Sequence, residues 1–137
     1  MNNITPVDEE HTFQGDVIIS QTDLDGIITY ANRAFAKVSG YKTEELIGQS
    51  HNIIRHPDMP KAVFSRLWET ISGGQAWNGL IKNIRKDGLY YWVETEILPI
   101  SDETGNITGY IAVRKEASKK DINEIQETYT KMLETQK

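Results

Sequence analysis

The stretch of sequence that decides the fold is Asn52-Ile53-Ile54-Arg55-His56-Pro57-Asp58-Met59-Pro60. Within nine residues it holds a guanidinium, an imidazole and a carboxylate, and it stands directly ahead of a segment with the apolar spacing of a helix. Further along the chain, Trp77-Asn78-Gly79 opens a half that is rich in strand patterns. Polar side chains at the junction between a helix and a sheet can line a pocket, so this combination indicates a domain that holds an organic cofactor.

Strand patterns lie on both sides of this stretch. Short apolar runs bounded by turn residues predict five strands, at 17–22, 27–30, 77–85, 89–100 and 106–113. The segments between neighbouring strands, at 23–26, 86–88 and 102–105, have the composition of hairpin turns. The order is two strands, several short helices and three strands. This order predicts an α+β fold with an antiparallel sheet of about five strands, short helices on one side of it and an appended C-terminal helix.

Helix start and stop signals fill the segment between the two groups of strands. Asn32 is expected to cap a first helix, and Thr43 a second short helix that Gly48 ends. Asp58 is expected to cap a longer helix with Pro60 in its first turn. The apolar stripe predicted for this helix consists of Val63, Phe64, Leu67, Trp68 and Ile71.

The last part of the chain has a different pattern. Ser118 and Asp121 resemble a capping box, and the apolar seam that follows them steps by three and four residues. This seam consists of Ile122, Ile125, Tyr129 and Met132. It is under two heptads long, so we expect a helix that packs on a partner or on its own sheet. The predicted organisation is a flexible N-terminal arm at 1–14, a folded domain at 15–117 and a C-terminal amphipathic helix at 118–137.

Composition excludes several classes of site and partner. The net charge of -5 at pH 7 argues against a nucleic-acid partner, because phosphate binding needs a basic face. The absence of cysteine excludes disulfides, thiolate metal sites and flavin photochemistry through a cysteinyl adduct. No run approaches the roughly 18 consecutive apolar residues of a membrane-spanning helix, so we expect no membrane span in this chain and a cytoplasmic setting.

The residues from Asp23 to Asn32, together with Ser39-Gly40-Tyr41, resemble a PAS domain over about residues 17–117. The stretch from Gly48 to Lys61 carries a more specific resemblance, to the FAD-binding PAS domain of Aer-type aerotaxis and energy-taxis receptors. Further residues that share it are Phe64, Trp68, Trp77-Asn78-Gly79, Lys82-Asn83, Arg85-Lys86-Asp87-Gly88 and Tyr91-Trp92-Val93. PAS membership alone says little about function, because the fold hosts many ligands.

This resemblance implies a PAS sensory domain at 15–117 that binds FAD and senses redox state, oxygen or respiratory flux, with a signalling helix at 118–137. It implies that the partner is a chemoreceptor signalling module with a HAMP-type linker, in the same chain or in a separate transducer. We expect either a fragment of a receptor or a stand-alone PAS protein, held at the inner face of the membrane by a missing region or by a partner. In that family, the residues implicated in FAD binding or signalling match Asn32, Arg55, His56, Asp58, Phe64, Trp68 and Asn83.

The residue types also indicate how a flavin could be held. The flat ring needs an apolar slot, which Phe64, Trp68 and Trp77 could supply if they are not ordinary core residues. Asn83 has the same strand parity as Trp77, so its amide is expected to face the core and could pair with N5 or O4 of the ring. An amide can donate or accept, so it could flip when the ring nitrogen gains a proton. The other interpretation of Asn83 is a surface amide.

The polar residues of the opening stretch could bind a cofactor or have a structural role. Arg55 suits a phosphate or a flavin carbonyl, and otherwise it is a surface charge or pairs with Asp58. His56 could hydrogen-bond a cofactor, order its loop by bonding the backbone, or ligate a haem iron. For Asp58 we expect a helix cap that shapes the pocket, and Asn32 is most simply a helix cap as well.

No catalytic constellation and no metal site emerge from the sequence, so we expect a sensor and not an enzyme. Serines lack the glycine-flanked elbow of a hydrolase, and the two histidines of the opening region, His51 and His56, have no third ligand at metal-site spacing. Two alternatives stay open. One is a haem-binding gas sensor with His56 or His51 as axial ligand, and the other is an interaction module without a cofactor. A homodimer through the tail seam is a further expected partner.

Overall fold

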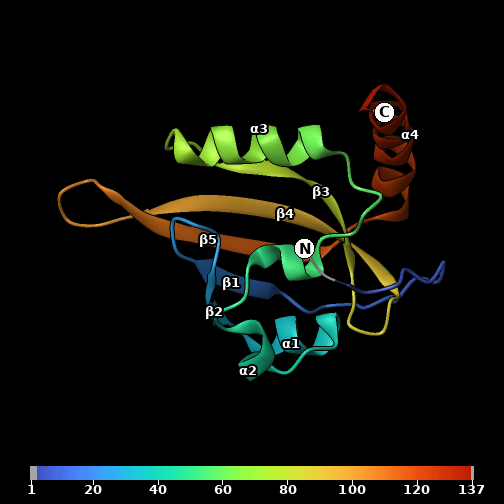
Figure 1. Cartoon of the computed structure of the whole chain (residues 1–137), viewed down its shortest axis with the longest axis horizontal. Coiled ribbons are helices and arrows are strands. Elements are labelled where there is room, and N and C mark those ends of the chain that lie inside the picture. The colour runs from blue at the N-terminus through green and yellow to red at the C-terminus, as the bar shows by residue number, and fades with distance from the viewer. Residues whose placement is uncertain (1–2, 137) are drawn as a thin grey trace.

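The computed structural model describes residues 3–136 and contains one antiparallel sheet of five strands in the order β2-β1-β5-β4-β3 (Figure 1). The elements in chain order are β1 (Ile18–Thr22), β2 (Ile28–Ala31), α1 (Arg33–Ser39), α2 (Thr43–Leu46), the 3-10 helix η1 (His51–Ile54), α3 (Lys61–Ser72), β3 (Trp77–Ile84), β4 (Tyr90–Ser101), β5 (Ile107–Glu116) and α4 (Lys119–Gln136). The α+β fold, the antiparallel sheet and the C-terminal helix expected from the sequence are confirmed.

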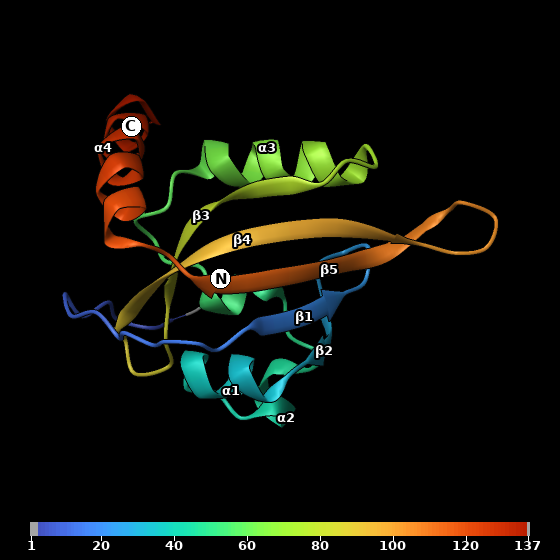
Figure 2. The same cartoon turned by 180° about the vertical axis from the view of Figure 1, so that it is seen from behind.

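Pairing of β1 with β5 joins the two halves of the chain into one sheet. Ser20 lies opposite Ala112 in this pairing, and alternation along the strands places both on the face that the short helices cover. Phe35, Leu46 and Ile54 from those helices are fully buried against this inner face. Figures 1 and 2 show α3 near the β3 edge of the sheet. They show α1 and α2 near the opposite edge, beside β1 and β2.

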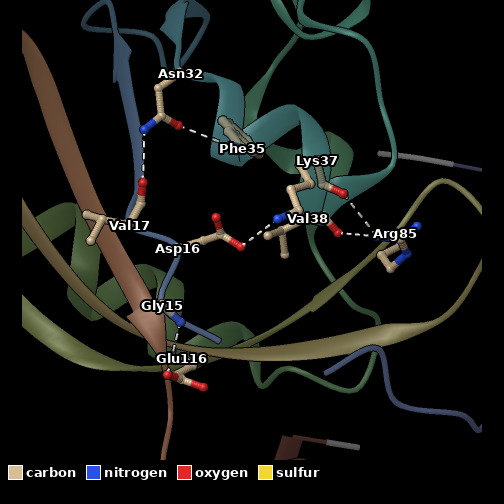
Figure 3. A network of polar contacts seen from close by, with 9 residues as sticks. All are labelled: Gly15, Asp16, Val17, Asn32, Phe35, Lys37, Val38, Arg85 and Glu116. Atoms are coloured by element: carbon tan, nitrogen blue, oxygen red, sulfur yellow. Dashed lines mark hydrogen bonds and ion pairs between the residues drawn. The ribbon is translucent and has the colours of Figure 1, made fainter. Parts of the chain in front are cut away.

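Asn32 links α1 to the start of β1 through side-chain hydrogen bonds, and Figure 3 shows those to Phe35 and Val17. Its Oδ1 accepts hydrogen bonds from the backbone N–H groups of Phe35, at 3.0 Å, and Ile19, at 3.1 Å. Its Nδ2 donates to the carbonyl of Val17 at 2.9 Å. The predicted helix cap at Asn32 is confirmed. One amide therefore satisfies an orphan donor of the helix and two backbone groups at the start of β1.

Two predicted helix starts were wrong by one or two residues. The residue that caps α3 is Pro60 and not Asp58, because the Asp58 carboxylate is turned away toward Lys82, with 3.2 Å between Oδ2 and Nζ. Pro60 has φ -64 and ψ 137, so its extended backbone delays the first helical residue to Lys61. Likewise the cap of α2 is Lys42, and Thr43 is its first helical residue.

α4 packs on the domain itself. Tyr129 is buried, its ring stacks on Trp92 with centroids 6.3 Å apart, and its hydroxyl donates to the carbonyl of Leu80 at 2.6 Å. β3 is an edge strand, so this bond covers a carbonyl that no neighbouring strand reaches. At its far end, α4 receives a hydrogen bond from the backbone N–H of Lys61 to Gln136 Oε1 at 2.8 Å. Tyr129 of the predicted seam thus packs on the chain's own sheet, and α4 contacts the start of α3 through Gln136.

The N-terminal arm runs beside the hairpin between β3 and β4. The N–H of Val7 donates to Gly88, at 2.9 Å, and the N–H of His11 donates to Tyr90, at 2.7 Å. The flexibility expected for residues 1–14 stays a prediction. Residues 1 and 2 of this arm, and Lys137 at the other end, lie outside the described part of the chain. Within residues 3–136, no helix has both the length and the apolar character needed to cross a bilayer.

We predict that Asn32→Ala lowers the free energy of unfolding by about 2 kcal/mol, because it removes a helix cap and two hydrogen bonds to the backbone at the start of β1. Asn32→Asp keeps the acceptor oxygen and loses only the donor to Val17, so we expect it to retain about half of this stability. Urea unfolding followed by circular dichroism measures both. Equal losses in the two variants would contradict the assignment of the acceptor as the principal cap.

We predict that Tyr129→Phe speeds hydrogen exchange throughout α4, because it removes the bond to Leu80 and about 1 kcal/mol of docking free energy. Tyr30→Phe is the matched control, since the Tyr30 side chain is exposed. Mass spectrometry of peptides that span 119–136 gives the readout. Unchanged exchange in Tyr129→Phe would show that ring stacking alone holds the helix.

Candidate functional site

A cavity of about 690 Å³, including its open mouth, lies between the inner face of the sheet and the segment that carries η1 and α3. One side is apolar and is formed by Ile54, Phe64, Leu67, Trp68, Ile71 and Ile81. The polar residues that line it include His51, Arg55, Asn83, Thr95 and Arg114, with Thr22 and Asn52.

Four of the predicted site residues, Arg55, Phe64, Trp68 and Asn83, come together at this cavity. Asn83 is 4% exposed, so the expectation that its amide faces the interior is confirmed. A backbone bridge joins Asn83 to Arg55, which ties the opening stretch to the edge of β3. The Arg55 guanidinium lies over the Phe64 ring at 3.8 Å from its centroid, and burial lowers the pKa of Arg55.

Trp68 closes the cavity where α3 approaches the β1–β2 turn. Its ring meets Tyr110 edge to face, with centroids 5.7 Å apart and an angle of 81°. A Cβ on Gly26 would lie 3.2 Å from the Trp68 ring, and Gly26 has φ +81, a value that favours glycine. Trp68 is nevertheless 39% exposed. It therefore forms part of the wall between the cavity and solvent and is not a core residue.

Asn32, His56, Asp58 and Trp77 do not line the cavity, and their direct contact with a cofactor stays a prediction. The buried ring of His56 accepts a hydrogen bond at Nδ1 from the Asp58 N–H at 3.0 Å, which orders the turn before α3. Burial, and then Lys82, lower the pKa of His56, while Asp58 raises it. Trp77 shares the inner face but folds over Gly79, where a Cβ would be 2.5 Å from the indole.

The residue that sequence reasoning missed is Arg114. It is 3% exposed and lines the cavity from β5. Its guanidinium donates to Ser20 Oγ at 2.8 Å and to His51 Nε2 at 3.0 Å, and it lies over the Phe35 ring at 4.7 Å from the centroid. Within residues 3–136, no carboxylate forms an ion pair with this guanidinium. Burial lowers the pKa of Arg114 to about 10, so it keeps its charge at neutral pH.

His51 belongs to the same cluster, although the sequence indicated no role for it beyond an alternative haem ligand. Its Nε2 accepts from Arg114 and lies 3.2 Å from Ser20 Oγ, so this nitrogen carries no proton and the ring is neutral. Burial, and then Arg114, lower the pKa of His51 to about 3. The ring stacks on Phe35 with centroids 5.7 Å apart. The Arg114 guanidinium is therefore held by two neutral polar side chains, His51 and Ser20.

We predict that the wild-type protein is more sensitive to acid than His51→Gln. The pKa of His51 is lower in the folded state than its ordinary value of 6.5, so the unfolded state binds the proton first and stability falls as pH drops from about 6.5 toward 3. Between pH 7 and pH 5 the wild type should lose about 2 kcal/mol more than the variant.

Urea unfolding at the two pH values measures this difference. The pKa values of His11 and His56 are also lowered, but both residues are present in the two proteins and their effects cancel. Parallel acid losses in the two proteins would mean that His51 protonates in the folded state as easily as in the unfolded one.

Comparison with known sequences gives one family and several relatives. A family model described as the PAS fold matches residues 28–114. The aerotaxis receptor of Escherichia coli (strain K12) is 43% identical over 125 residues, which are 91% of this chain and 24% of the receptor. The nitrogen fixation regulatory protein of Klebsiella pneumoniae is 32% identical over 105 residues, which are 77% of this chain and 21% of that protein. The chain thus spans a quarter or less of the length of these relatives.

Solved structures share the architecture. The PAS domain of a protein from Colwellia psychrerythraea superposes with a TM-score of 0.69 at 28% identity, over 75% of this chain and 87% of that one. The light-state structure of the blue-light photoreceptor Aureochrome1 LOV has a TM-score of 0.72 at 24% identity, over 80% of this chain and 91% of that one, and shows the fold alone. The family match and the sheet order agree, and the chain belongs to the PAS family.

Proposed function

We propose that this PAS domain binds a flavin, FAD, in the cavity and transmits its redox state to a chemotaxis signalling partner. The observation that carries the proposal is Arg114, a buried cation that lines the cavity and has no carboxylate partner among residues 3–136. A buried charge is costly unless another group compensates it. A ligand with electronegative atoms along one edge would provide that compensation.

The residues at the cavity fit the chemistry of an isoalloxazine ring. Its faces are flat and apolar, and the cavity offers Phe64, Ile81 and Trp68 for contact with them. Its polar edge carries carbonyl oxygens and ring nitrogens, and Arg114 and Asn83 offer donors to such atoms. The resemblance to the aerotaxis receptor supports the same ligand class, and one of the structurally similar proteins is a light-oxygen-voltage domain studied with a flavin analogue.

When bound, a flavin would supply reversible reduction coupled to proton uptake at a ring nitrogen. Asn83 can respond to that change, because its amide donates through one atom and accepts through the other. Arg114 only donates, so it would hold an atom that stays an acceptor in both redox states. Neutral His51 keeps the orientation of Arg114 fixed through the bond at 3.0 Å. In this proposal Arg114 holds the flavin in place, and Asn83 responds to its redox state.

A change at Asn83 has a short path to α4. Asn83 lies on β3, three positions after Leu80, whose carbonyl accepts the Tyr129 hydroxyl. The backbone of Asn83 is also bridged to Arg55, ahead of α3, and α3 begins at Lys61, which bonds Gln136. A coupling free energy of about 1–3 kcal/mol between cofactor state and helix docking is enough for an allosteric switch.

The partner would be a chemoreceptor signalling module, in the same chain or in a separate transducer, that reads the position of α4. The aerotaxis receptor is about four times as long as the region matched here, which leaves room for such a module in cis. The apolar seam of α4 is the surface that undocking would expose, and it could then pair with the partner or with a second copy. In this proposal the domain is a sensor and catalyses no reaction.

Titration of flavin-free protein with FAD, followed by quenching of flavin fluorescence, tests the ligand. We expect Arg114→Met to weaken binding by about ten- to a hundredfold, because it removes a charged donor. Its stability without ligand should not fall by much, since a buried cation is removed with it. Arg33→Met, at an exposed arginine, is the control and should bind as the wild type does. Failure of the wild type to bind FAD, FMN or riboflavin rejects the proposal.

A second experiment tests transmission. We expect hydrogen exchange in α4 to differ between air-oxidised and dithionite-reduced protein loaded with FAD, and Asn83→Ala to lose most of this difference while it still folds. Asn78→Ala is the matched control, because Asn78 is an exposed amide on the same strand. If Asn83→Ala keeps the full redox difference in hydrogen exchange of α4, Asn83 does not transmit the signal.

A further inference from the structure

Two buried side-chain hydroxyls in the described part of the chain have no hydrogen-bond partner, Tyr91 Oη and Thr95 Oγ1. Both lie on β4 with an even spacing, and strand alternation puts both on the inner face. A buried hydroxyl without a partner costs on the order of 1–3 kcal/mol. Such atoms in a folded protein need an explanation, and a bound ligand is one.

The two hydroxyls differ in their access to the cavity. Thr95 is 2% exposed and lines the cavity, whereas Tyr91 does not line it. The Tyr91 ring is closed in by Phe13, edge to face at 6.3 Å between centroids. Burial raises the pKa of Tyr91, and the nearby Asn83 side chain acts to lower it, so a polar neighbour already faces this hydroxyl. Of the two residues, Thr95 is therefore the one that a molecule in the cavity could meet.

Neither cross-strand neighbour of Thr95 bonds its hydroxyl. In the sheet register it lies between Gly79 on β3 and Arg114 on β5. Gly79 has no side chain that could bond the hydroxyl, and the guanidinium of Arg114 donates to Ser20 and His51. Cross-strand neighbours on one face have Cβ atoms about 4.5–5.5 Å apart, so the hydroxyl and the guanidinium share one side of the cavity.

We propose that the Thr95 hydroxyl is a ligand-binding group that hydrogen-bonds the heteroatom edge of a bound flavin, beside Arg114. This inference rests on the proposed function and adds a residue to it that neither the sequence patterns nor the resemblance indicated. Valine has nearly the shape of threonine, and the Thr95 hydroxyl has no hydrogen-bond partner in the described chain, so a bound ligand would give it one. The atom it binds is a carbonyl oxygen or a ring nitrogen.

A hydroxyl also has a property that Arg114 lacks. It donates or accepts after a rotation of its hydrogen, with no movement of the backbone. It can therefore bond a ring nitrogen both before and after that nitrogen gains a proton. Thr95 would keep the ring in place through the redox cycle and leave the structural response to Asn83, whose two atoms must exchange places.

The test compares the FAD dissociation constants of three variants with the wild type. Thr95→Val removes the hydroxyl and keeps the shape, Thr95→Ser keeps the hydroxyl, and Tyr91→Phe removes the buried hydroxyl that does not reach the cavity. We expect Thr95→Val to bind FAD about three- to tenfold more weakly. The other two variants should bind within about twofold of the wild type, because each keeps the Thr95 position able to donate and accept.

Each other outcome has one meaning. Equal FAD binding by the wild type and folded Thr95→Val overturns the inference and leaves flavin binding intact. Weak binding by both Thr95→Ser and Thr95→Val assigns the effect to the methyl group and also overturns it. A wild-type protein that binds no FAD, FMN or riboflavin overturns both this inference and the proposed function. Thermal unfolding of each variant without ligand verifies that it folds before its affinity is compared.

Discussion

The buried positive charge of Arg114 is the constraint on which the site depends. Arg114 keeps its proton at neutral pH, and its guanidinium is held by Ser20, His51 and the face of Phe35 without a carboxylate in the described chain. These contacts connect β5, β1, η1 and α1, so a single side chain aligns the elements on one side of the cavity. Because burial, and then the same charge, lower the pKa of His51 to about 3, the cluster keeps one fixed charge over a wide range of pH.

The connection from this cavity to the surface uses the edge strand. β3 offers the Asn83 amide to the cavity and the Leu80 carbonyl to α4, and η1 and α3 are joined to it through Arg55 and to α4 through Lys61. Most of a sheet resists small displacements because each strand is paired on both sides. β3 is paired with a strand on one side only, so it is the part of this sheet where a change in one hydrogen bond moves a helix most easily.

Sequence patterns predicted the parts of this structure that local chemistry decides. The N-cap at Asn32, the hairpin turns, the amphipathic α4 and the inward direction of Asn83 follow from capping preference and strand or helix periodicity. The cap at Asp58 was wrong because a contact with Lys82, 24 positions away, draws its carboxylate from the helix. Local propensity cannot anticipate a competing partner of that kind.

The sequence patterns failed to predict Arg114 for a different reason. The strand predicted at 106–113 ended just before Arg114, because a charged residue beside Lys115 and Glu116 has the pattern of a strand end. Its burial depends on His51, 63 positions earlier, and on Ser20, 94 positions earlier. Neither contact has a local signature. A continuation of the strand alternation from Tyr110 and Ala112 was the one available sign that Arg114 faces inward.

The central claim is that a flavin compensates the charge in the cavity, and the absorption spectrum of the protein as purified tests it most directly. The account predicts flavin bands that bleach with dithionite and return in air, and a fluorescent flavin in the supernatant after denaturation. A colourless protein that stays colourless after incubation with FAD, or one with a haem Soret band, would contradict it.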